Sequence, residues 1–337
     1  MNKEKYWHGR NVFITGINGF IGGNLAKSLI DKGANVFGLL RNHRKDTFLY
    51  FEGISDKITL INGDITDFTL LKRIISEEQI NVVYHLAAQV EIGIGLTNPF
   101  LTFETNIKGT YSLLEAIKEC SQTIESIIIA STDKSYGSYG REMMPYKEEY
   151  PLKPIYPYDV SKACADMIAR SYASDIFNMP IVVTRFCNIF GPGQLNFSAL
   201  IPDAIRSALG YYEFIPRGNG NQERDFMYVQ DVVELYLCIG NSLALNPKKY
   251  SGEIFNAGTN TIHTVLSVIE NIYKLIDNSD LKNIRKNMIG KNTVGEIECQ
   301  YMDYEKVNKY FGWKPKHDFI DGLSKTIEWY KNYLSSK

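Results

Sequence analysis

The chain has 337 residues, which at roughly 150 residues per domain corresponds to about two domains or one large α/β unit. Hydrophobic residues make up 44% and charged residues 22%, close to the globular average, which argues against a disordered, collagen-like or disulfide-scaffold protein. The 37 Lys and Arg nearly balance the 38 Asp and Glu. A formal net charge of -1 offers no overall field for a polyanion, so we expect neither nucleic acid nor a membrane as partner.

The five cysteines are widely spaced and form no C-x-x-C pair, which is typical of reduced residues in a cytoplasmic protein. The first ten residues are polar and charged, and no uninterrupted apolar stretch approaches the ~18 residues of a membrane span. We therefore expect a cytoplasmic protein, and we expect no metal site.

Short β-branched runs alternate with longer amphipathic stretches in the first half of the chain, which is the pattern of βαβ units around a parallel sheet. The predicted strands are residues 11–15, 35–40, 58–61, 82–86, 126–130 and 181–185. Helical spacing predicts helices over residues 21–31, 69–77, 100–120 and 161–177. Residues 246–251 and 277–291 are polar enough to be loops.

Beyond Asn188 the alternation gives way to glycine- and proline-rich turns mixed with helices, which predicts a smaller lobe. The expected fold class is α/β, a doubly wound parallel sheet with a smaller mixed α/β lobe. We assign residues 1–187 to the sheet domain and 188–337 mainly to the lobe, with residues from about 225 to 258 crossing back to the sheet. The ligand crevice should lie between the two parts.

A G-x-x-G-x-x-G motif joins the first predicted strand to the first predicted helix. Glycines there let the backbone turn tightly and approach a pyrophosphate, whose charge is met by amides at the helix N-terminus. A plain glycine turn is the alternative, but the position between first strand and first helix favours a dinucleotide. The residues expected to hold the cofactor here are Gly16, Asn18, Gly19, Phe20, Ile21 and Gly22.

The second predicted strand ends in Leu40-Arg41 rather than in a carboxylate that would bind the ribose 2'-hydroxyl of NAD. Arg41, followed by further basic residues, suits a 2'-phosphate, so the sequence favours NADP over NAD. The alternative for this segment is a solvated basic loop.

Further cofactor contacts are expected after the third and fourth strands. Asp64 and Ile65 are placed to hold the adenine, and the small residues of the segment after His85 let the backbone approach the pyrophosphate and the nicotinamide ribose. That segment consists of Leu86, Ala87, Ala88 and Gln89. His85 itself is interpreted as a packed histidine at a strand end rather than as a catalyst.

Tyr158 and Lys162 form a Y-x-x-x-K pair. On a helix they lie one turn apart, so the ammonium can lower the pKa of the phenol and also hold the nicotinamide ribose. A phenolate stabilised in this way is a base for a substrate hydroxyl. The chain has 22 tyrosines, so chance pairs are expected, but a second element supports this one: the fifth strand ends in Ser131-Thr132-Asp133-Lys134. Chemistry in α/β proteins is found at such carboxyl ends.

At this point the sequence resembles the extended short-chain dehydrogenase/reductase family, in its nucleotide-sugar epimerase and dehydratase branch. The resemblance covers essentially the whole chain, and it rests on these segments in the order of the family: GINGFIG, NGDITD, HLAAQ, TNIKGT, STDKSYG, YDVSK, RFCNIFGPG, RDFMYVQD, FNAG and FGWKP. It implies that the sheet is a Rossmann doubly wound parallel sheet, with residues 1–187 as its NAD(P)-binding domain and the smaller mixed α/β lobe as the substrate-binding lobe. It also implies cofactor contacts from Asn106 and a homodimer formed through the helices at 100–120 and 161–177.

Within this branch, the resemblance implies that a 4-epimerase needs only Thr132, Tyr158 and Lys162. A 4,6-dehydratase must also remove the C5 proton and protonate the departing C6 hydroxyl, and Asp133 and Lys134 occupy the positions for this. Many dehydratases have Asp-Glu there; Asp-Lys is similar to the CDP-glucose 4,6-dehydratase subgroup. Lysine as the base requires a lowered pKa, which a neighbouring carboxylate opposes, so acid and base stay open. The alternative is a solvated salt bridge in a turn.

The resemblance places the substrate against the second half of the chain. Asn188 and Arg224 are implied at the sugar diphosphate, where a guanidinium suits phosphate geometry. Gln89 is expected to contact the substrate as well, and Ile201 and Arg217 lie in segments for the base and ribose. The alternative for Arg224 is an ion pair with Asp225 in place of a substrate contact. Residues 191–196 depart from the CDP-glucose subgroup and 218–225 are more similar to the thymidine and UDP branches, so nucleobase and sugar stay open.

The sequence thus predicts an NAD(P)-dependent nucleotide-sugar 4,6-dehydratase that supplies 4-keto-6-deoxy sugars for surface glycans such as lipopolysaccharide. The enzymatic alternative is a nucleotide-sugar 4-epimerase. A non-catalytic dinucleotide-binding regulator is the other alternative, and the presence of Thr132, Tyr158 and Lys162 argues against it.

Overall fold

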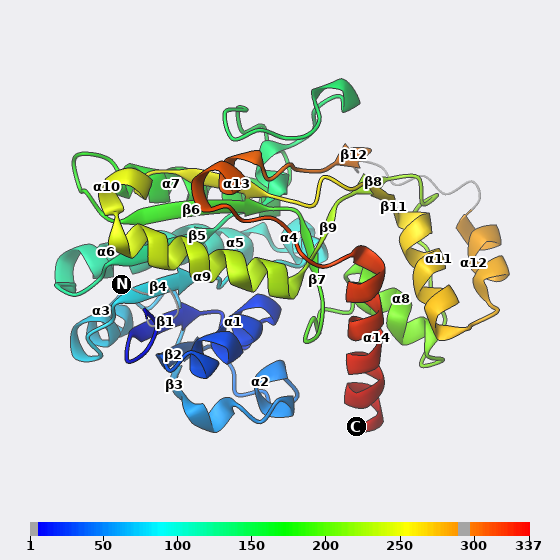
Figure 1. The fold of residues 1–337 in the computed structure, drawn as a ribbon, viewed down its shortest axis with the longest axis horizontal. Coiled ribbons are helices and arrows are strands. Elements are labelled where there is room, and N and C mark those ends of the chain that lie inside the picture. The colour runs from blue at the N-terminus through cyan, green and yellow to red at the C-terminus, as the bar shows by residue number, and fades with distance from the viewer. Residues whose placement is uncertain (1–5, 289–296) are drawn as a thin grey trace.

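Seven parallel strands form the central sheet of the computed structural model, which describes residues 6–288 and 297–337 (Figure 1). The strands are β1 (Asn11–Thr15), β2 (Asn35–Leu40), β3 (Ile58–Asn62), β4 (Val82–His85), β5 (Ser126–Ala130), β6 (Ile181–Phe186) and β10 (Ile254–Ala257). Their order is β10-β6-β5-β4-β1-β2-β3. The order reverses between β1 and β4, and this is where such a sheet binds its ligand.

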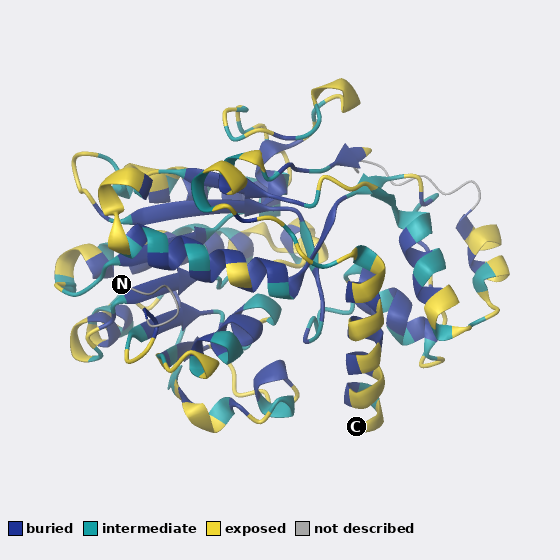
Figure 2. Ribbon diagram, in the orientation of Figure 1, coloured by how far each residue is buried: buried dark blue, intermediate teal, exposed yellow. Residues whose placement is uncertain are grey.

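Both faces of the sheet are buried, because successive side chains of each strand point to opposite sides and nearly all are apolar. Val12 and Ile14 belong to one hydrophobic core, whereas Phe13 between them belongs to the other. Figure 2 shows the strands as the most deeply buried part of the molecule. The continuous apolar runs of the sequence are therefore explained by burial on two faces.

Helices cover both sides. On one face lie α1 (Phe20–Asp31) and α9 (Val229–Leu245), which share a core with Val12 and Ile14. On the other lie α3 (Phe68–Glu77), α6 (Gly109–Cys120) and α7 (Pro157–Tyr172), which share a core with Phe13. Shorter helices are α2 (Phe48–Phe51), α4 (Ile92–Thr97), α5 (Pro99–Phe103) and α10 (Pro247–Tyr250).

The second half of the chain builds the smaller lobe beside the carboxyl ends of the strands (Figure 1). It contains a parallel pair, β7 (Asn188–Phe190) and β9 (Phe226–Tyr228), and a mixed sheet of β11 (His263–Thr264), β8 (Glu223–Arg224) and β12 (Cys299–Gln300). Its helices are α8 (Leu200–Ala208), α11 (Val265–Ile276), α12 (Leu281–Met288) and α14 (Phe319–Ser335), while α13 (Glu305–Phe311) packs on β10.

The predicted Rossmann sheet with a smaller mixed lobe is confirmed, and each predicted strand is found within one residue of its expected ends. The predicted helix at 100–120 is interrupted: α5 passes through a π-helical turn (Glu104–Lys108) into α6. The predicted helix at 161–177 begins earlier, because Pro157 starts α7, and this places Tyr158 inside the helix.

Two loop predictions are wrong. Residues 246–251 include α10, and residues 277–291 include α12; residues 289–291 lie outside the described part of the chain. In α12 only Ile284 and Met288, one turn apart, are buried, so its polar composition hides a narrow apolar stripe. Across the described residues, no helix is long and apolar enough to cross a membrane. All five cysteines are free, Cys187 and Cys299 being buried and the other three only partly.

A buried ion pair behind β5 joins the sheet to α7. Arg185 of β6 donates from Nε and Nη2 to the two carboxylate oxygens of Asp166, at 2.8 and 3.0 Å, and both side chains are at most 1% exposed. The same guanidinium donates to the hydroxyl of Tyr136, 2.8 Å away, which in turn donates to Asn256 of β10. One cation therefore fixes α7 relative to the 3-10 turn η4 (Asp133–Tyr136) that follows β5.

Arg185 and Arg170 both lie beside Asp166, but only Arg185 is buried; Arg170 is 4.0 Å away and half-exposed. We expect Arg185→Met to destabilise the protein by about 3–5 kcal/mol, because it leaves a buried carboxylate unpaired. Arg170→Met should cost about 0–1 kcal/mol, as for a surface pair. Denaturant-unfolding midpoints of the two variants measure the difference, and similar midpoints would contradict this assignment.

Candidate active site

The turn between β1 and α1 is closed by three glycines. Gly16 has a positive φ of 75°, and a Cβ there would lie 2.8 Å from the backbone nitrogen of Ala87. A Cβ on Gly22 would lie 2.3 Å from the carbonyl oxygen of Gly16. Only glycine allows these two approaches, and they fix the start of α1 against the loop after β4.

The N-terminus of α1 is suited to an anion. Its N-cap, Gly19, makes no side-chain capping bond, and the first turn contains no acidic residue. The first amides are thus available to a diphosphate group, which the helix dipole also favours. Phe20 and Ile21 form the first turn, and Asn18 accepts a hydrogen bond from the Thr47 hydroxyl at 3.1 Å. This arrangement fits the pyrophosphate of a dinucleotide.

The residues predicted at the adenosine end lie around β2 and β3. Arg41 is exposed directly after β2. Arg44, farther along the same loop, forms an ion pair with Asp46 at 2.8 Å. After β3, Oδ1 of Asp64 accepts from the Thr66 amide and hydroxyl, at 2.9 and 2.7 Å, and Ile65 is buried.

His85 is a structural residue in this fold, as interpreted from the sequence. It is buried at the end of β4, between Thr15 and Thr110 at 2.8 and 2.9 Å, and burial lowers its pKa to about 3. The Thr110 hydroxyl donates to the carbonyl of Asn106, so it accepts from Nε2 of His85 and the imidazole is neutral. On the other side, Thr15 also accepts from the amide of Ala87.

Asn106 holds the loop after β4 from the π-helical turn. Its side chain accepts from the Gln89 amide at 2.7 Å and donates to the Gln89 carbonyl at 3.0 Å and to the Ser161 hydroxyl at 2.8 Å. Leu86, Ala87 and Ala88 are partly exposed along this loop. Oε1 of Gln89 is buried without a hydrogen-bond partner in the described structure, and a buried acceptor of this kind suits a polar ligand group.

Tyr158 and Lys162 lie one turn apart at the start of α7, but the electrostatics differ from the expectation. Lys162 is buried, which lowers its pKa to about 8, and its ammonium donates to the carbonyl of Ala130. Burial raises the pKa of Tyr158, and the charges of Asp133 and Asp159 add to this, while a hydrogen bond with Thr132 opposes it. The predicted lowering of the phenol's pKa by Lys162 is therefore wrong for this structure, because burial of the phenol dominates.

Thr132, Asp133 and Lys134 form the turn at the carboxyl end of β5. The Thr132 hydroxyl donates to Oδ1 of Asp133 at 3.0 Å, and the Lys134 ammonium donates to the same oxygen at 3.2 Å. The Asp133 side chain is 1% exposed, so the pair is not a solvated salt bridge. Lys134 also donates to Oδ1 of Asn188 at 3.4 Å, which brings the predicted substrate residue Asn188 into this cluster.

Asp159 is a residue that the sequence analysis missed. It is 7% exposed beside Tyr158, and burial and Asp133 raise its pKa to about 6, while Lys134 opposes the rise. Its position directly after the tyrosine was visible, but its proximity to Lys134, 25 positions earlier, follows only from the fold.

The predicted diphosphate residue Arg224 lies on β8. Its guanidinium donates to the carbonyl of Glu223 at 2.9 Å, whereas Asp225 is buried and accepts from the Thr259 amide and hydroxyl. A cavity of about 320 Å³ adjoins this strand. It is lined by Arg141, Asn219, Asn221, Gln222, Glu223, Glu298 and Cys299.

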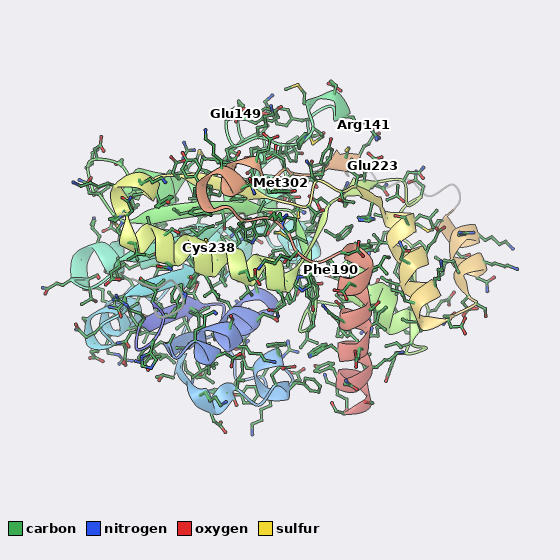
Figure 3. The ribbon with its side chains drawn as sticks, viewed as in Figure 1. Arg141, Glu149, Phe190, Glu223, Cys238 and Met302 are labelled. Carbon is green, nitrogen blue, oxygen red and sulfur yellow. The ribbon has the colours of Figure 1, made fainter. Side chains whose placement is uncertain are left out.

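Arg141 and Glu223 were also missed. They form an ion pair at 2.7 Å that joins the loop between η4 and α7 to β8, as Figure 3 shows. Arg217 is exposed near Asp203. Ile201 lies in the hydrophobic core of the lobe at 2% exposure, so its side chain packs inward, and its place near a substrate stays a prediction.

Tyr158 and the turn after β5 thus lie at the carboxyl edge of the sheet, where parallel α/β proteins place their chemistry, next to a turn built for a diphosphate. The class of protein with this fold and this pair of elements is the extended short-chain dehydrogenase/reductase class.

A model of the family described as GDP-mannose 4,6 dehydratase matches residues 13–326, and the chain belongs to this family. The human dTDP-D-glucose 4,6-dehydratase is 31% identical over 96% of this chain and 90% of its own length. The CDP-glucose 4,6-dehydratase of Salmonella typhimurium is 28% identical over 99% of this chain and 94% of its own length. The predicted dehydratase family is confirmed, and relatives with different nucleobases match at similar identity.

Solved structures agree on the fold. The dTDP-glucose 4,6-dehydratase of Bacillus anthracis, in complex with NAD, has a TM-score of 0.82 at 30% identity, covering 96% of this chain and 97% of that chain. A UDP-glucose 4-epimerase of Thermotoga maritima has a TM-score of 0.84 at 27% identity, and the match covers 96% of this chain and 99% of that chain. The overall shape is therefore shared by dehydratases and epimerases, and the side chains of the site must separate them.

Gly22 offers a test of the dinucleotide turn. We expect Gly22→Ala to weaken dinucleotide binding about tenfold or more, because the new Cβ meets the Gly16 carbonyl and the turn must shift at a cost of about 1–3 kcal/mol. Gly93→Ala in α4 is the matched control, since its Cβ meets nothing within 4 Å. Titration with reduced nicotinamide dinucleotide measures both, and unchanged affinity in Gly22→Ala would contradict the assignment.

Proposed function

We propose that the protein is a nucleotide-sugar 4,6-dehydratase that converts a nucleoside diphosphate-hexose to its 4-keto-6-deoxy form. The observation that carries this proposal is the ion pair of buried Asp133 with partly exposed Lys134, at 3.2 Å, directly after Thr132. An epimerase needs one acid/base group at C4, whereas elimination of water needs two more at C5 and C6. This site supplies them.

In the first step Tyr158 takes the proton of the C4 hydroxyl, assisted by Thr132 and Lys162. A nicotinamide dinucleotide held by the turn before α1 would supply the hydride chemistry of the reaction, between C4 and C6. Because burial raises the pKa of Tyr158, its base form needs a nearby positive charge, and this part is assigned to Lys162, one turn away on α7. The carbonyl of Ala130 orients the Lys162 ammonium.

In the second step the C4 ketone acidifies the C5–H bond, so that Asp133 and Lys134 can divide the work of base and acid. Burial of Asp133 keeps water from competing for its carboxylate, and Asn188 helps to orient Lys134. The substrate diphosphate is assigned to Asn188 and Arg224, with Arg217 toward the nucleotide and Gln89 toward the sugar. Ile201 can contribute only through its backbone.

The cofactor is proposed to be a nicotinamide dinucleotide, NADP in preference to NAD. The basic, exposed Arg41 after β2 and the absence of a carboxylate at that position support a 2'-phosphate, although the relative from Bacillus anthracis contains NAD. Asp64 and Ile65 are assigned to the adenine, and Leu86 to Gln89 with Asn106 to the nicotinamide end.

A homodimer is proposed through α5, α6 and α7. Large apolar side chains are exposed there, among them Phe100 at 73%, Tyr111 and Met167. The five free cysteines support a reducing, cytoplasmic location, and 4-keto-6-deoxy sugars would serve the synthesis of surface glycans.

The reaction is tested by incubating the purified protein with CDP-, GDP-, UDP- and dTDP-hexoses and measuring the masses of the products by mass spectrometry. We expect one of them to yield a product lighter by one water. An unchanged mass with altered stereochemistry would favour the epimerase instead.

Tyr158→Phe should abolish turnover while dinucleotide binding is kept, because the hydroxyl is the base and not a binding group.

The cofactor is tested by releasing it from the protein and measuring its mass. We expect NADP, and we expect Arg41→Ala to weaken NADP binding about tenfold or more while NAD binding changes little, since only NADP carries the 2'-phosphate. Arg44→Ala, which removes the guanidinium already paired with Asp46, is the matched control on the same loop. Equal loss of both dinucleotides in Arg41→Ala would contradict the preference.

A further inference from the structure

Helix α14 lies beside the segment of residues 42–52 after β2, which we name the adenosine segment, and Figure 1 shows the end of α14 near α2. The Tyr333 hydroxyl donates to the carbonyl of Asp46 at 2.8 Å, and the Trp329 indole donates to Oε1 of Glu52 at 2.9 Å. Asp46 precedes α2 and Glu52 follows it. Hydrogen bonds from the second half of α14 therefore fix the adenosine segment on both sides of α2.

Aromatic rings fill the space between these two hydrogen bonds. Phe51 of α2 packs edge-on against Trp329 and Tyr333, with ring centroids 5.2 and 5.3 Å apart. The rings of Trp329 and Tyr333 stack on each other at 4.9 Å, and the two residues are only 9% and 3% exposed. Ring pairs of this kind stabilise a contact beyond the burial of their surface. The helix thus holds the adenosine segment by apolar packing as well as by hydrogen bonds.

The adenosine segment borders both positions that are assigned to the adenosine half of the dinucleotide. It follows Arg41, at the end of β2, where a sheet of this type binds the adenosine ribose. Farther along, the Thr47 hydroxyl donates to Asn18 of the glycine turn, where the pyrophosphate is assigned, at 3.1 Å. Residues 41–46 are exposed, whereas Thr47 is buried. The first part of the segment therefore runs from the ribose to the pyrophosphate along the surface.

The opposite end of α14 is fixed in the lobe. Phe319 packs on Phe190 of β7 and on Phe226 of β9, with ring centroids 5.3 and 5.9 Å apart. A Cβ on Gly322 would lie 2.8 Å from the ring of Phe190, so the helix lies directly against β7. This strand also carries Asn188, which is assigned to the substrate diphosphate. A helix of 17 residues is about 25 Å long, so α14 joins the substrate side of the lobe to the adenosine segment as one rigid element.

We infer that α14 holds the adenosine segment closed along the dinucleotide, and that Trp329 and Tyr333 are positioning residues that set the rate of dinucleotide exchange. The inference rests on the dinucleotide site of the proposed function. The proposed reaction moves a hydride away from C4 and back to C6, so it consumes no dinucleotide and gains nothing from exchanging it. A segment held closed from the lobe keeps the dinucleotide in place between turnovers.

The inference has a kinetic signature. Opening of the adenosine segment breaks its hydrogen bonds to α14, whereas the closed segment keeps them. Loss of one bond makes opening easier and leaves the closed site as it was. Since entry and exit both pass through the open form, association and dissociation become faster by the same factor, and the equilibrium affinity stays nearly constant. A residue that contacts the dinucleotide directly would instead change dissociation and affinity together.

The experiment measures the exchange of NADH and of NADPH by stopped-flow fluorescence. Mixing the loaded protein with an excess of the oxidised form gives the dissociation rate, and mixing the free protein with the reduced form gives the association rate. We expect Tyr333→Phe to raise both rates about three- to tenfold, which is the effect of one neutral hydrogen bond. The Kd should change by less than about twofold. Trp329→Phe, which removes the donor to Glu52 and keeps a ring, should act in the same direction.

Tyr84→Phe is the matched control. It removes a buried hydroxyl that also donates to a backbone carbonyl, that of Tyr236 on α9 at 3.0 Å, and it should leave both exchange rates in place. Equal exchange rates in Tyr333→Phe and Tyr84→Phe overturn the inference, and so does faster dissociation without faster association. A wild-type protein that binds neither NADH nor NADPH would instead overturn the dinucleotide site of the proposed function.

Discussion

The buried Arg185 guanidinium is the interaction on which the geometry of the site depends. It binds Asp166 on the helix that carries Tyr158 and Lys162, and it binds Tyr136 at the end of the turn that carries Thr132 to Lys134. Loss of Asp166 would leave a buried cation without its carboxylate partner, and loss of Tyr136 would remove the hydrogen bond to the turn, so the helix and the turn are held at one separation. Tyr136 extends the link to Asn256 of β10, the last strand added to the sheet.

The sequence predicts the sheet well, because burial on both faces makes each strand a continuous apolar run bounded by polar residues. It also predicts that Thr132, Asp133, Lys134, Tyr158 and Lys162 gather in one place, since two strand–helix junctions end at the same edge. The contacts that it does not predict join distant segments through side chains. The pair of Arg141 with Glu223 carries no pattern in the chain, and the narrow stripe of α12 is masked by its polar residues.

Burial explains why the ionisation of the site could not be predicted. Spacing alone places Lys162 near Tyr158 and suggests a phenol of lowered pKa, but the loss of water around the hydroxyl acts in the opposite direction and dominates. The overall charge of -1 is equally uninformative, because the charges that matter are a few groups in the turn after β5 and at the start of α7. The N-terminus of α1 and Arg224 are the positive groups assigned above to two separate diphosphates, whereas in η4 the Lys134 ammonium pairs with the Asp133 carboxylate.

The π-helical turn at Glu104–Lys108 determines how many residues the chain needs between α5 and α6. In a π turn the hydrogen bonds span five residues instead of four, so the turn holds one residue more than an α-helix of the same span. That extra residue lets Asn106 reach Gln89 and Ser161 while α5 and α6 continue in register on either side. Deleting one residue here would rotate the preceding helical residues by about 100° around the helix axis relative to α6. A regular α-helix could then form only if Asn106 rotated away from Gln89 in the loop after β4.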